Sequence, residues 1–438
     1  MISGSGENVY RALGAKIDNL PTRAPWNETF HSILKELYTP EEADLVVKLP
    51  YTLSSLDRIA RITKIEKARL RTMLEQLCKK GLVMDIWNEK DKQYHYMPSP
   101  LVIGIFEFTM MRTGDGLNTK QWAKLFHEYM SEEGSFYTAN LSHGEKVSVM
   151  RVIPVEETIR TDEHIEFLDY EKATSLIESA DRFALALCSC RNEKFHEGKK
   201  VCDTPLDNCS LFGIGADMAI RNNLAREVSK SEMMENFARS LELGLVFCMN
   251  NAHKPLNVCH CCKCCCNALA GLSRFGYPNA VISSRFISTI HGDTCTGCGK
   301  CVDVCPVNAT SLTSANDPKK PKRKKGQVNA ELCLGCGVCA YKCPTHSIEM
   351  ISRGNRVIQP GTLFETTILG SLERGTLQNQ IFDNPMSGTQ GFMRSFMGAF
   401  LRLPMVKRAL MSDALRSSFL QFMKIGARAQ GKGWITEL

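Results

Sequence analysis

Residues 295–306 read CTGCGKCVDVCP, and residues 333–344 read CLGCGVCAYKCP. Each stretch places four cysteines at the spacing C-x2-C-x2-C-x3-C, with a proline directly after the fourth. Closely spaced thiolates of this kind bind thiophilic metals such as zinc and iron. A pair of CxxC zinc knuckles is the alternative, but two evenly spaced triples with a more distant fourth thiol fit such knuckles poorly. The pattern therefore favours iron-sulfur clusters over zinc.

This double motif resembles the two-cluster bacterial ferredoxins, and the resemblance covers a domain that we place at residues 286–352. In those proteins each run supplies three thiolates to one [4Fe-4S] cluster, while its fourth cysteine binds the other cluster. The resemblance thus implies one cluster on Cys295, Cys298, Cys301 and Cys343. It implies a second cluster on Cys333, Cys336, Cys339 and Cys305.

Glycines and prolines in the two runs carry further expectations about the backbone. Glycines let the chain curl tightly around each cluster and point N–H groups at its sulfurs, and the runs contain Gly297, Gly299, Gly335 and Gly337. We expect Pro306 and Pro344 to end each loop and to start the helix that follows.

Length and composition limit the class of protein. The chain has 438 residues, enough for about three domains, and its 43% hydrophobic and 23% charged residues are ordinary for a globular protein. Its 20 cysteines are not ordinary. The N-terminal stretch MISGSGENVYRALGAKIDNL has no apolar signal core, and no run approaches 18 apolar residues. We therefore expect a cytoplasmic protein whose thiols are metal ligands and not disulfides.

The formal net charge of +7 must be corrected for the expected clusters. An oxidised [4Fe-4S] cluster with four thiolates carries about two negative charges, so two clusters lower the net charge to about +3 and four lower it to about −1. Part of the basic excess neutralises the negative charge of the expected clusters. The positive net charge is therefore not by itself evidence for nucleic-acid binding.

The first hundred residues carry mainly helical patterns. A polar N-terminal arm is expected over residues 1–27, and residues 28–98 form the next domain. This domain has helical patterns at 30–38, 41–49, 54–63 and 64–81, and two apolar-alternating strands around a polar turn within 82–98. Helices followed by a hairpin resemble a winged-helix domain. Cys78 lies among the apolar positions of its helix and is expected to be a buried small hydrophobe.

A winged helix raises the possibility of DNA as a partner. The basic residues in the expected positions are Lys64, Lys67, Arg69, Arg71, Lys90 and Lys92. Acidic residues dilute this basic field, namely Glu66, Glu75, Glu89 and Asp91. The alternative is a solvated helix face on a module that docks another protein, and this is the favoured interpretation.

The middle of the chain divides into a helical connector, residues 99–140, and a cysteine-rich α/β domain, residues 141–285. The connector should hold helices at 101–112 and 119–133. The α/β domain should begin with a β-rich run at 147–155. A strand, a helix and a second strand that ends in cysteines should then follow within 166–191, with two more helices and a strand within 214–247.

Ten cysteines of this domain are candidate metal ligands once Cys248 is set aside: Cys188, Cys190, Cys202, Cys209, Cys259, Cys261, Cys262, Cys264, Cys265 and Cys266. Six of them fall within eight residues, and adjacent side chains point in different directions, so they serve two centres or one centre with spare thiols. We expect one or two further iron-sulfur clusters, with a structural zinc site or a redox-active dithiol as alternatives. Arg191 is expected to bond or neutralise a cluster, and His260 to hydrogen-bond nearby instead of acting as a ligand.

Two basic segments complete the chain. The spacer between the two cysteine runs contains Lys319, Lys320, Lys322, Arg323, Lys324 and Lys325. It is either a solvated loop or a surface that attracts an acidic partner. The C-terminal region, residues 353–438, has a basic amphipathic pattern over 394–433, broken by Pro404. This pattern fits peripheral contact with a membrane, docking into a groove of another protein, or packing on the protein's own core.

Together these patterns predict an α+β multidomain protein with a winged helix, a cysteine-rich α/β middle domain, a ferredoxin-like 2[4Fe-4S] domain and a helical C-terminal tail. The order of these domains along the chain resembles that of multi-cluster iron-sulfur proteins of anaerobic microbes. The resemblance implies single-electron transfer between redox proteins. The alternatives are a redox-responsive DNA-binding regulator and an oxidoreductase subunit that uses the middle cysteines as a reaction centre. No catalytic acid or base is predicted, so an electron carrier is favoured over a stand-alone enzyme.

Overall fold

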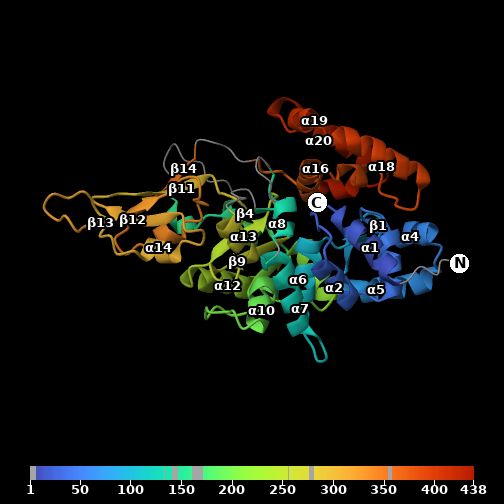
Figure 1. Ribbon diagram of the computed structural model, residues 1–438, viewed down its shortest axis with the longest axis horizontal. Helices are drawn as coiled ribbons and strands as arrows, with labels where there is room; N and C mark the ends of the chain where they lie inside the picture. The colour runs from blue at the N-terminus through green and yellow to red at the C-terminus, as the bar shows by residue number, and fades with distance from the viewer. Residues whose placement is uncertain are drawn as a thin grey trace.

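The computed structural model describes residues 6–132, 134–140, 147–159, 171–254, 256–275, 281–353 and 358–438. In Figure 1 the cysteine runs of residues 295–344 form one end of an elongated molecule, and the N-terminal helices form the other end. A mixed α/β region lies between them, and the C-terminal helices lie along one side.

Residues 6–98 fold into five helices and a small sheet, and helix caps define the starts of several helices. The helices are α1 (Gly6–Asp18), α2 (Glu28–Leu37), α3 (Pro40–Lys48), α4 (Leu56–Thr63) and α5 (Lys67–Lys79). Asn27 caps α2 by accepting from the backbone N–H of Phe30, and Thr39 forms a reciprocal capping box with Glu42 at α3. The antiparallel sheet has the order β1-β3-β2, with β1 (Ser54–Ser55), β2 (Val83–Asn88) and β3 (Gln93–Pro98).

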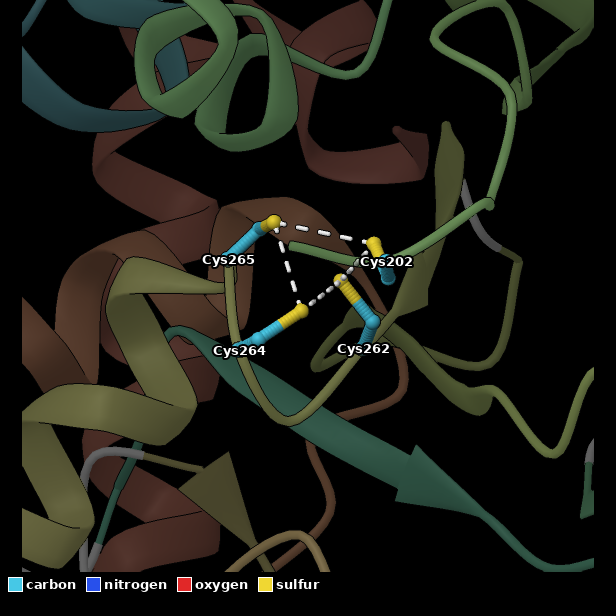
Figure 2. Close-up of side chains that lie close together, drawn as sticks. All are labelled: Cys202, Cys262, Cys264 and Cys265. Atoms are coloured by element: carbon cyan, nitrogen blue, oxygen red, sulfur yellow. Dashed lines mark hydrogen bonds between the residues drawn. The ribbon is translucent and has the colours of Figure 1, made fainter. Parts of the chain in front are cut away.

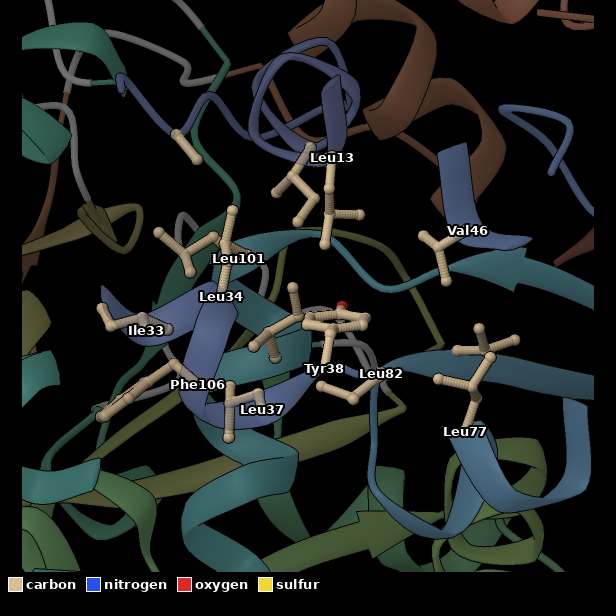
Figure 3. Close-up of a cluster of buried hydrophobic side chains, with 14 of the residues drawn as sticks. Leu13, Ile33, Leu34, Leu37, Tyr38, Val46, Leu77, Leu82, Leu101 and Phe106 are labelled. Carbon is tan, nitrogen blue, oxygen red and sulfur yellow. The ribbon is translucent and has the colours of Figure 1, made fainter. Parts of the chain in front are cut away.

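Apolar side chains from these helices meet in one core, shown in Figure 3. Leu13 and Ile17 of α1 are completely buried there, together with Leu34 of α2 and Leu77 of α5. The segment expected to be a polar arm therefore contains a core helix. Its apolar residues recur at helical spacing, which indicates a helix. The arm was expected instead because the segment looks polar and contains Pro21 and Pro25. Cys78 is buried in this core.

The connector contains shorter helices than expected. They are α6 (Phe106–Met111), α7 (Thr119–His127), which continues into a helical turn at Glu128–Glu132, and α8 (Ser135–Asn140). The first expected helix does not start at residue 101, because Val102, Ile103 and Gly104 have non-helical backbone angles. Helix α6 therefore begins only at Phe106.

A seven-stranded sheet with the order β10-β4-β8-β9-β6-β5-β7 organises the middle of the chain. Its strands are β4 (Met150–Ile153), β5 (Phe183–Ala186), β6 (Cys209–Phe212), β7 (Ala225–Glu227), β8 (Val246–Asn250), β9 (Asn257–Cys261) and β10 (Val281–Ile282). All neighbours pair antiparallel except β10 and β4. Strands β6 and β9 were not expected from the sequence; both are short, and β9 contains two cysteines and a histidine. The strand expected near residues 166–170 lies outside the described residues.

Among the described residues of this region, the helices beside the sheet are α9 (Ala173–Ser179), α10 (Ser189–His196), α11 (Gly213–Arg221), α12 (Lys230–Glu242) and α13 (Asn267–Phe275). On the α12 side of the sheet, Phe237 packs against Phe212 and Phe247. This aromatic layer fills one face of the sheet, which leaves the cysteine side chains of β9 for the other face.

The two cysteine runs belong to two small antiparallel sheets. Strand β11 (Phe286–Ile290) pairs with β14 (Ile348–Ser352), and β12 (Thr310–Ser314) pairs with β13 (Lys324–Val328). Helices α14 (Lys300–Val304) and α15 (Val338–Tyr341) precede Pro306 and Pro344, and strands follow these prolines. The expectation that each proline starts a helix was therefore wrong. Proline ends the short helix because it has no N–H to continue the hydrogen-bond pattern.

The basic spacer is not a simple loop, since its last two lysines begin β13. The C-terminal region forms α16 (Leu363–Arg374), α17 (Leu377–Ile381), α18 (Gly388–Leu401), α19 (Pro404–Leu410) and α20 (Asp413–Ala429). Pro404 occupies the first turn of α19, where its missing N–H costs nothing. Among the residues that the structure describes, no helix combines the length and apolar character needed to cross a membrane.

Candidate metal centres

The first predicted set of ferredoxin cysteines surrounds a single cavity. The cavity is lined by Cys295, Cys298 and Cys301 from the first run and by Cys343 from the second run. Gly297 turns the first run at a positive φ of 71°, and a Cβ there would lie 2.2 Å from the carbonyl oxygen of Lys324. Only glycine fits this turn, because a side chain would push β13 away from the cavity.

The second predicted set lies deeper in the protein. Cys305, Cys333, Cys336 and Cys339 are all buried, whereas Cys298 of the first set is exposed. Burial raises the pKa of Cys336 well above its ordinary value, and the neighbouring thiols of Cys339, Cys333 and Cys305 add to this effect. Burial likewise raises the pKa of Cys339 to about 12. Four buried thiols therefore ionise together only if a positively charged centre compensates them, which iron would do.

Backbone and hydroxyl groups also meet these sulfurs. The N–H of Ala309 donates to Cys305 Sγ at 3.1 Å, and the N–H of Gly326 donates to Cys295 Sγ at 3.4 Å. Ser288 Oγ lies 3.2 Å from Cys339 Sγ. Such hydrogen bonds orient metal-binding thiolates and adjust the potential of an iron-sulfur cluster.

A second group of thiols gathers on one face of the seven-stranded sheet. Cys259 and Cys261 alternate with His260 on β9, so both point to the same face. Cys248 on β8 pairs directly with Cys259, and the β6–β9 register places Cys209 on the other side of Cys259. Directly paired residues of antiparallel strands share a face. The register thus brings four thiols from three strands together.

Three more thiols reach this face from the ends of neighbouring helices. Cys188 caps α10, Cys190 lies in its first turn, and Cys266 immediately precedes α13. A hydrogen bond with Cys266 raises the pKa of Cys190 well above its ordinary value, and bonds with Cys248, Cys259 and Cys266 do the same for Cys261. We call the seven residues the buried thiol set: Cys188, Cys190, Cys209, Cys248, Cys259, Cys261 and Cys266.

Cys248 was not among the candidate ligands expected from the sequence. The strand pairing that joins it to Cys259 is not visible in the sequence, so only a correct β8–β9 register could have identified it. Glu107 is a further buried ionisable group near this set that the sequence pattern did not indicate. Burial raises the pKa of Glu107 to about 8, with Cys259 as a nearby negative group.

The remaining four middle cysteines form a separate, compact group, shown in Figure 2. Cys262, Cys264 and Cys265 lie on the turn after β9, and Cys202 comes from the loop between α10 and β6. Neighbouring sulfurs are 3.5–3.8 Å apart around the group. A hydrogen bond from Cys265 lowers the pKa of Cys262 to about 5. We call these four residues the compact thiol set.

Arg191 lies between the two middle sets. Its guanidinium is completely buried, lies 3.7 Å from Cys262 Sγ and donates to the carbonyl oxygens of His260 and Pro205. Arg191 thus contacts the sulfur of one candidate ligand, and its expected role beside an iron-sulfur cluster stays a prediction. His260 points away from both sets, because its Nε2 lies 2.8 Å from Ser210 Oγ and its ring packs against Phe237 and Phe247.

Comparison with known families agrees with the geometry of the two cysteine runs. Residues 294–347 match the family described as a 4Fe-4S dicluster domain, so this part of the chain is an iron-sulfur domain of the ferredoxin type. No curated protein and no solved structure gives a significant match to the chain. The family match covers the two runs and does not extend to the middle cysteines.

Proposed function

We propose that this protein carries single electrons through two [4Fe-4S] clusters and passes them to a further iron-sulfur centre in its middle region. The observation that supports this proposal is the interleaved arrangement of the two cysteine runs, in which Cys343 joins the first set around one cavity. A cluster in that cavity would lie close to solvent, since Cys298 is exposed. The buried second set would then receive electrons from it.

The path into the middle region rests on packing. Cys248, Cys261 and Cys266 of the buried thiol set belong to the same apolar core as Cys305, Cys333 and Cys336 of the second ferredoxin set. The backbone N–H of Val155 also donates to the carbonyl oxygen of Cys336, which joins the chain after β4 to the second run. Seven thiols on one face of the sheet exceed what a single metal ion can bind, so we assign an iron-sulfur cluster to the buried thiol set.

The electron donor or acceptor at the exposed end would be an acidic redox protein. The β12–β13 hairpin borders the first cavity, because Lys324 lies against Gly297. Lys319, Lys320, Lys322 and Lys324 are all exposed on this hairpin and its turn. A basic surface beside a solvent-near cluster would raise the association rate with an acidic partner, and salt would weaken this effect.

Iron analysis and EPR of protein purified without air test this proposal. Two ferredoxin clusters and one middle cluster predict about twelve irons per chain at four per cluster. Reduction by dithionite should produce [4Fe-4S]¹⁺ signals that disappear when a one-electron acceptor is added. Replacing Cys261 and Cys266 together by serine should lower the iron content to about eight and leave the ferredoxin signals in place. Cys78→Ser is the matched control, because Cys78 lies in the N-terminal core.

Two results would contradict parts of the proposal separately. If the wild-type protein contains only about eight irons, the two ferredoxin clusters account for all of them at four irons each, and the middle cluster is contradicted. Protein with zinc and no iron at the two runs would remove electron transfer altogether.

We further propose that residues 28–98 form a winged-helix module that docks proteins and not DNA. Four of the six basic residues expected to contact DNA are paired with acids: Lys67 with Asp57, Arg69 with Glu41, Lys90 with Glu437, and Lys92 with Glu89. Such pairing leaves little net positive field for a phosphate backbone. Specific binding of a DNA duplex that depends on the cluster oxidation state would favour the regulator alternative instead.

The C-terminal helices support a proposal about location. Nine of the eighteen exposed large apolar residues in the described part of the chain lie between residues 386 and 425. Phe392, Phe396 and Phe400 recur at every fourth position of α18 and are 50–71% exposed. Of the basic residues in this region, Arg402, Arg408 and Arg428 are exposed and add positive charge beside the apolar side chains. We propose that this apolar, basic face rests on the surface of a membrane that contains anionic lipids.

A further inference from the structure

The compact thiol set differs in size from the two ferredoxin sets. Within the described part of the chain, it is the one group of three or more potential metal ligands whose donor atoms all lie within 4.8 Å of one another. In a [4Fe-4S] cluster each thiolate binds a different iron, so its four sulfurs stand farther apart than four sulfurs that share one ion. The compact set is too tight to surround a cluster.

The sulfur positions match a tetrahedron around a single ion. Four sulfurs at 2.3 Å from a zinc ion are about 3.8 Å apart along each edge of the tetrahedron. The observed separations are 3.8 Å for Cys202–Cys262, Cys202–Cys265 and Cys262–Cys264, and 3.5 Å for Cys264–Cys265. In a flat square of such sides, opposite sulfurs would be about 5.2 Å apart, so their separation within 4.8 Å means that the four atoms are folded toward a tetrahedron.

We propose that Cys202, Cys262, Cys264 and Cys265 bind one structural Zn²⁺ ion, separate from every iron-sulfur cluster of the protein. Zinc is the metal that four thiolates in tetrahedral geometry favour, and a closed site with four protein ligands is structural instead of catalytic. A zinc ion with four thiolates carries two negative charges. The Arg191 guanidinium at Cys262 and the Lys200 ammonium at the carbonyl oxygen of Cys202 supply two positive charges beside it.

The ion would join two segments that are distant in the sequence. Cys202 lies in the loop between α10 and β6, and the other three ligands lie on the turn between β9 and α13. Both segments continue into the buried thiol set, because Cys190 lies in α10, Cys209 begins β6, and Cys266 directly follows Cys265. A zinc clamp at this point would hold the ligands of the buried centre in register. The zinc assignment follows from the sulfur geometry alone and does not depend on the electron-transfer proposal.

Metal analysis of the full-length protein, purified without air, tests this inference. Wild-type protein should contain one zinc per chain in addition to its iron. Replacing Cys202 and Cys264 together by serine should remove this zinc while the ferredoxin EPR signals remain, and the control Cys78→Ser should keep both metals. Zinc K-edge X-ray absorption of the wild-type protein should show four sulfurs at about 2.3 Å, which decides the case even if the double variant does not fold.

Other outcomes would overturn the inference. If the wild-type protein contains no zinc and the double variant contains less iron than the wild type, the compact thiol set is an iron site. If the protein contains no zinc and two further thiols become titratable only after a reductant is added, the compact thiol set contains a redox-active dithiol. Failure of the electron-transfer proposal would appear separately, as missing iron at the two cysteine runs with the zinc still bound.

Discussion

Gly335 shows how single residues shape the second cysteine run. Its φ is +67°, and a Cβ there would lie 2.0 Å from the carbonyl oxygen of Phe286 and 2.4 Å from Ser284 Oγ. The run therefore passes against the chain before β11 with no room for a side chain. Ser284 strengthens this contact, because its hydroxyl donates to the carbonyl oxygen of Gly335 at 2.6 Å.

Gly335→Ala should displace the second run and weaken cluster binding there. The left-handed backbone alone costs an alanine about 1–2 kcal/mol, and the contact with Phe286 adds to this. We expect the iron content of the anaerobic protein to fall by about four per chain, the content of one cluster. Gly116→Ala is the matched control, since Gly116 has φ +76° and nothing within 4 Å of an added Cβ. Full iron content in Gly335→Ala would show that the loop tolerates the displacement.

Between elements, one buried ion network joins the two ends of the chain. Asp383, in the segment between α17 and α18, accepts hydrogen bonds from Arg58 of α4 at 2.7 and 2.8 Å and pairs with Lys432. Burial opposes ionisation of Asp383, but the hydrogen bonds from Arg58 and Lys432 outweigh it and hold its pKa well below the ordinary value. The network thus attaches the C-terminal helices to the N-terminal domain.

Asp383→Asn should loosen this attachment. Removing one partner of a buried network leaves the others uncompensated, which typically costs about 3–5 kcal/mol. The folded pKa lies below the unfolded value of about 3.9, so the carboxylate contributes fully at neutral pH and its contribution is lost only as pH falls through the folded pKa. At pH 7 we expect faster release of the C-terminal helices by limited proteolysis and a lower urea midpoint.

The control for this prediction is Asp413→Asn. Asp413 pairs with Arg416, but its side chain is 95% exposed. An exposed pair contributes at most about 1 kcal/mol, so proteolysis should hardly change. Equal effects of the two substitutions would show that the Asp383 network is not what attaches the C-terminal helices.

At the scale of the whole molecule, the candidate centres form a sequence from surface to interior. The first ferredoxin set is near solvent, the second is buried, and the buried thiol set shares the core of the second. The C-terminal apolar face belongs to a different part of the structure, the helices that lie along one side in Figure 1. This separation would let the protein rest on a surface while its exposed cluster stays accessible to a partner.

Vesicle binding tests the proposed membrane contact. The protein should co-sediment with vesicles that contain anionic lipids and bind more weakly to neutral ones. Replacing Phe396 and Phe422 by glutamate, at 64% and 71% exposed positions, should reduce binding at least tenfold. Phe195→Glu is the control, because Phe195 is 53% exposed on α10, outside the C-terminal face. Self-association without vesicle binding would instead assign the face to a second copy of the chain.

Local patterns were sufficient to predict the parts of the structure that depend on near neighbours. The repeated cysteine spacing identified the iron-sulfur domain, and apolar periodicity predicted α2 to α5 and the β2–β3 hairpin. The same reasoning failed where a short element competes with a strong local signal. Pro306 and Pro344 follow helices and do not start them, and the short strands β6 and β9 carry no clear apolar alternation.

What the amino-acid sequence determines alone is the ferredoxin-type domain, because all eight of its predicted ligands lie within 50 residues, at the spacing that ferredoxin clusters require. Only the tertiary structure decides how the middle cysteines divide. Adjacent residues such as Cys261 and Cys262 belong to different sets, and Cys248 joins a set only through its pairing with Cys259. The reason is physical: side chains alternate along a strand, and strand register and loop closure bring together thiols that sequence distance keeps apart.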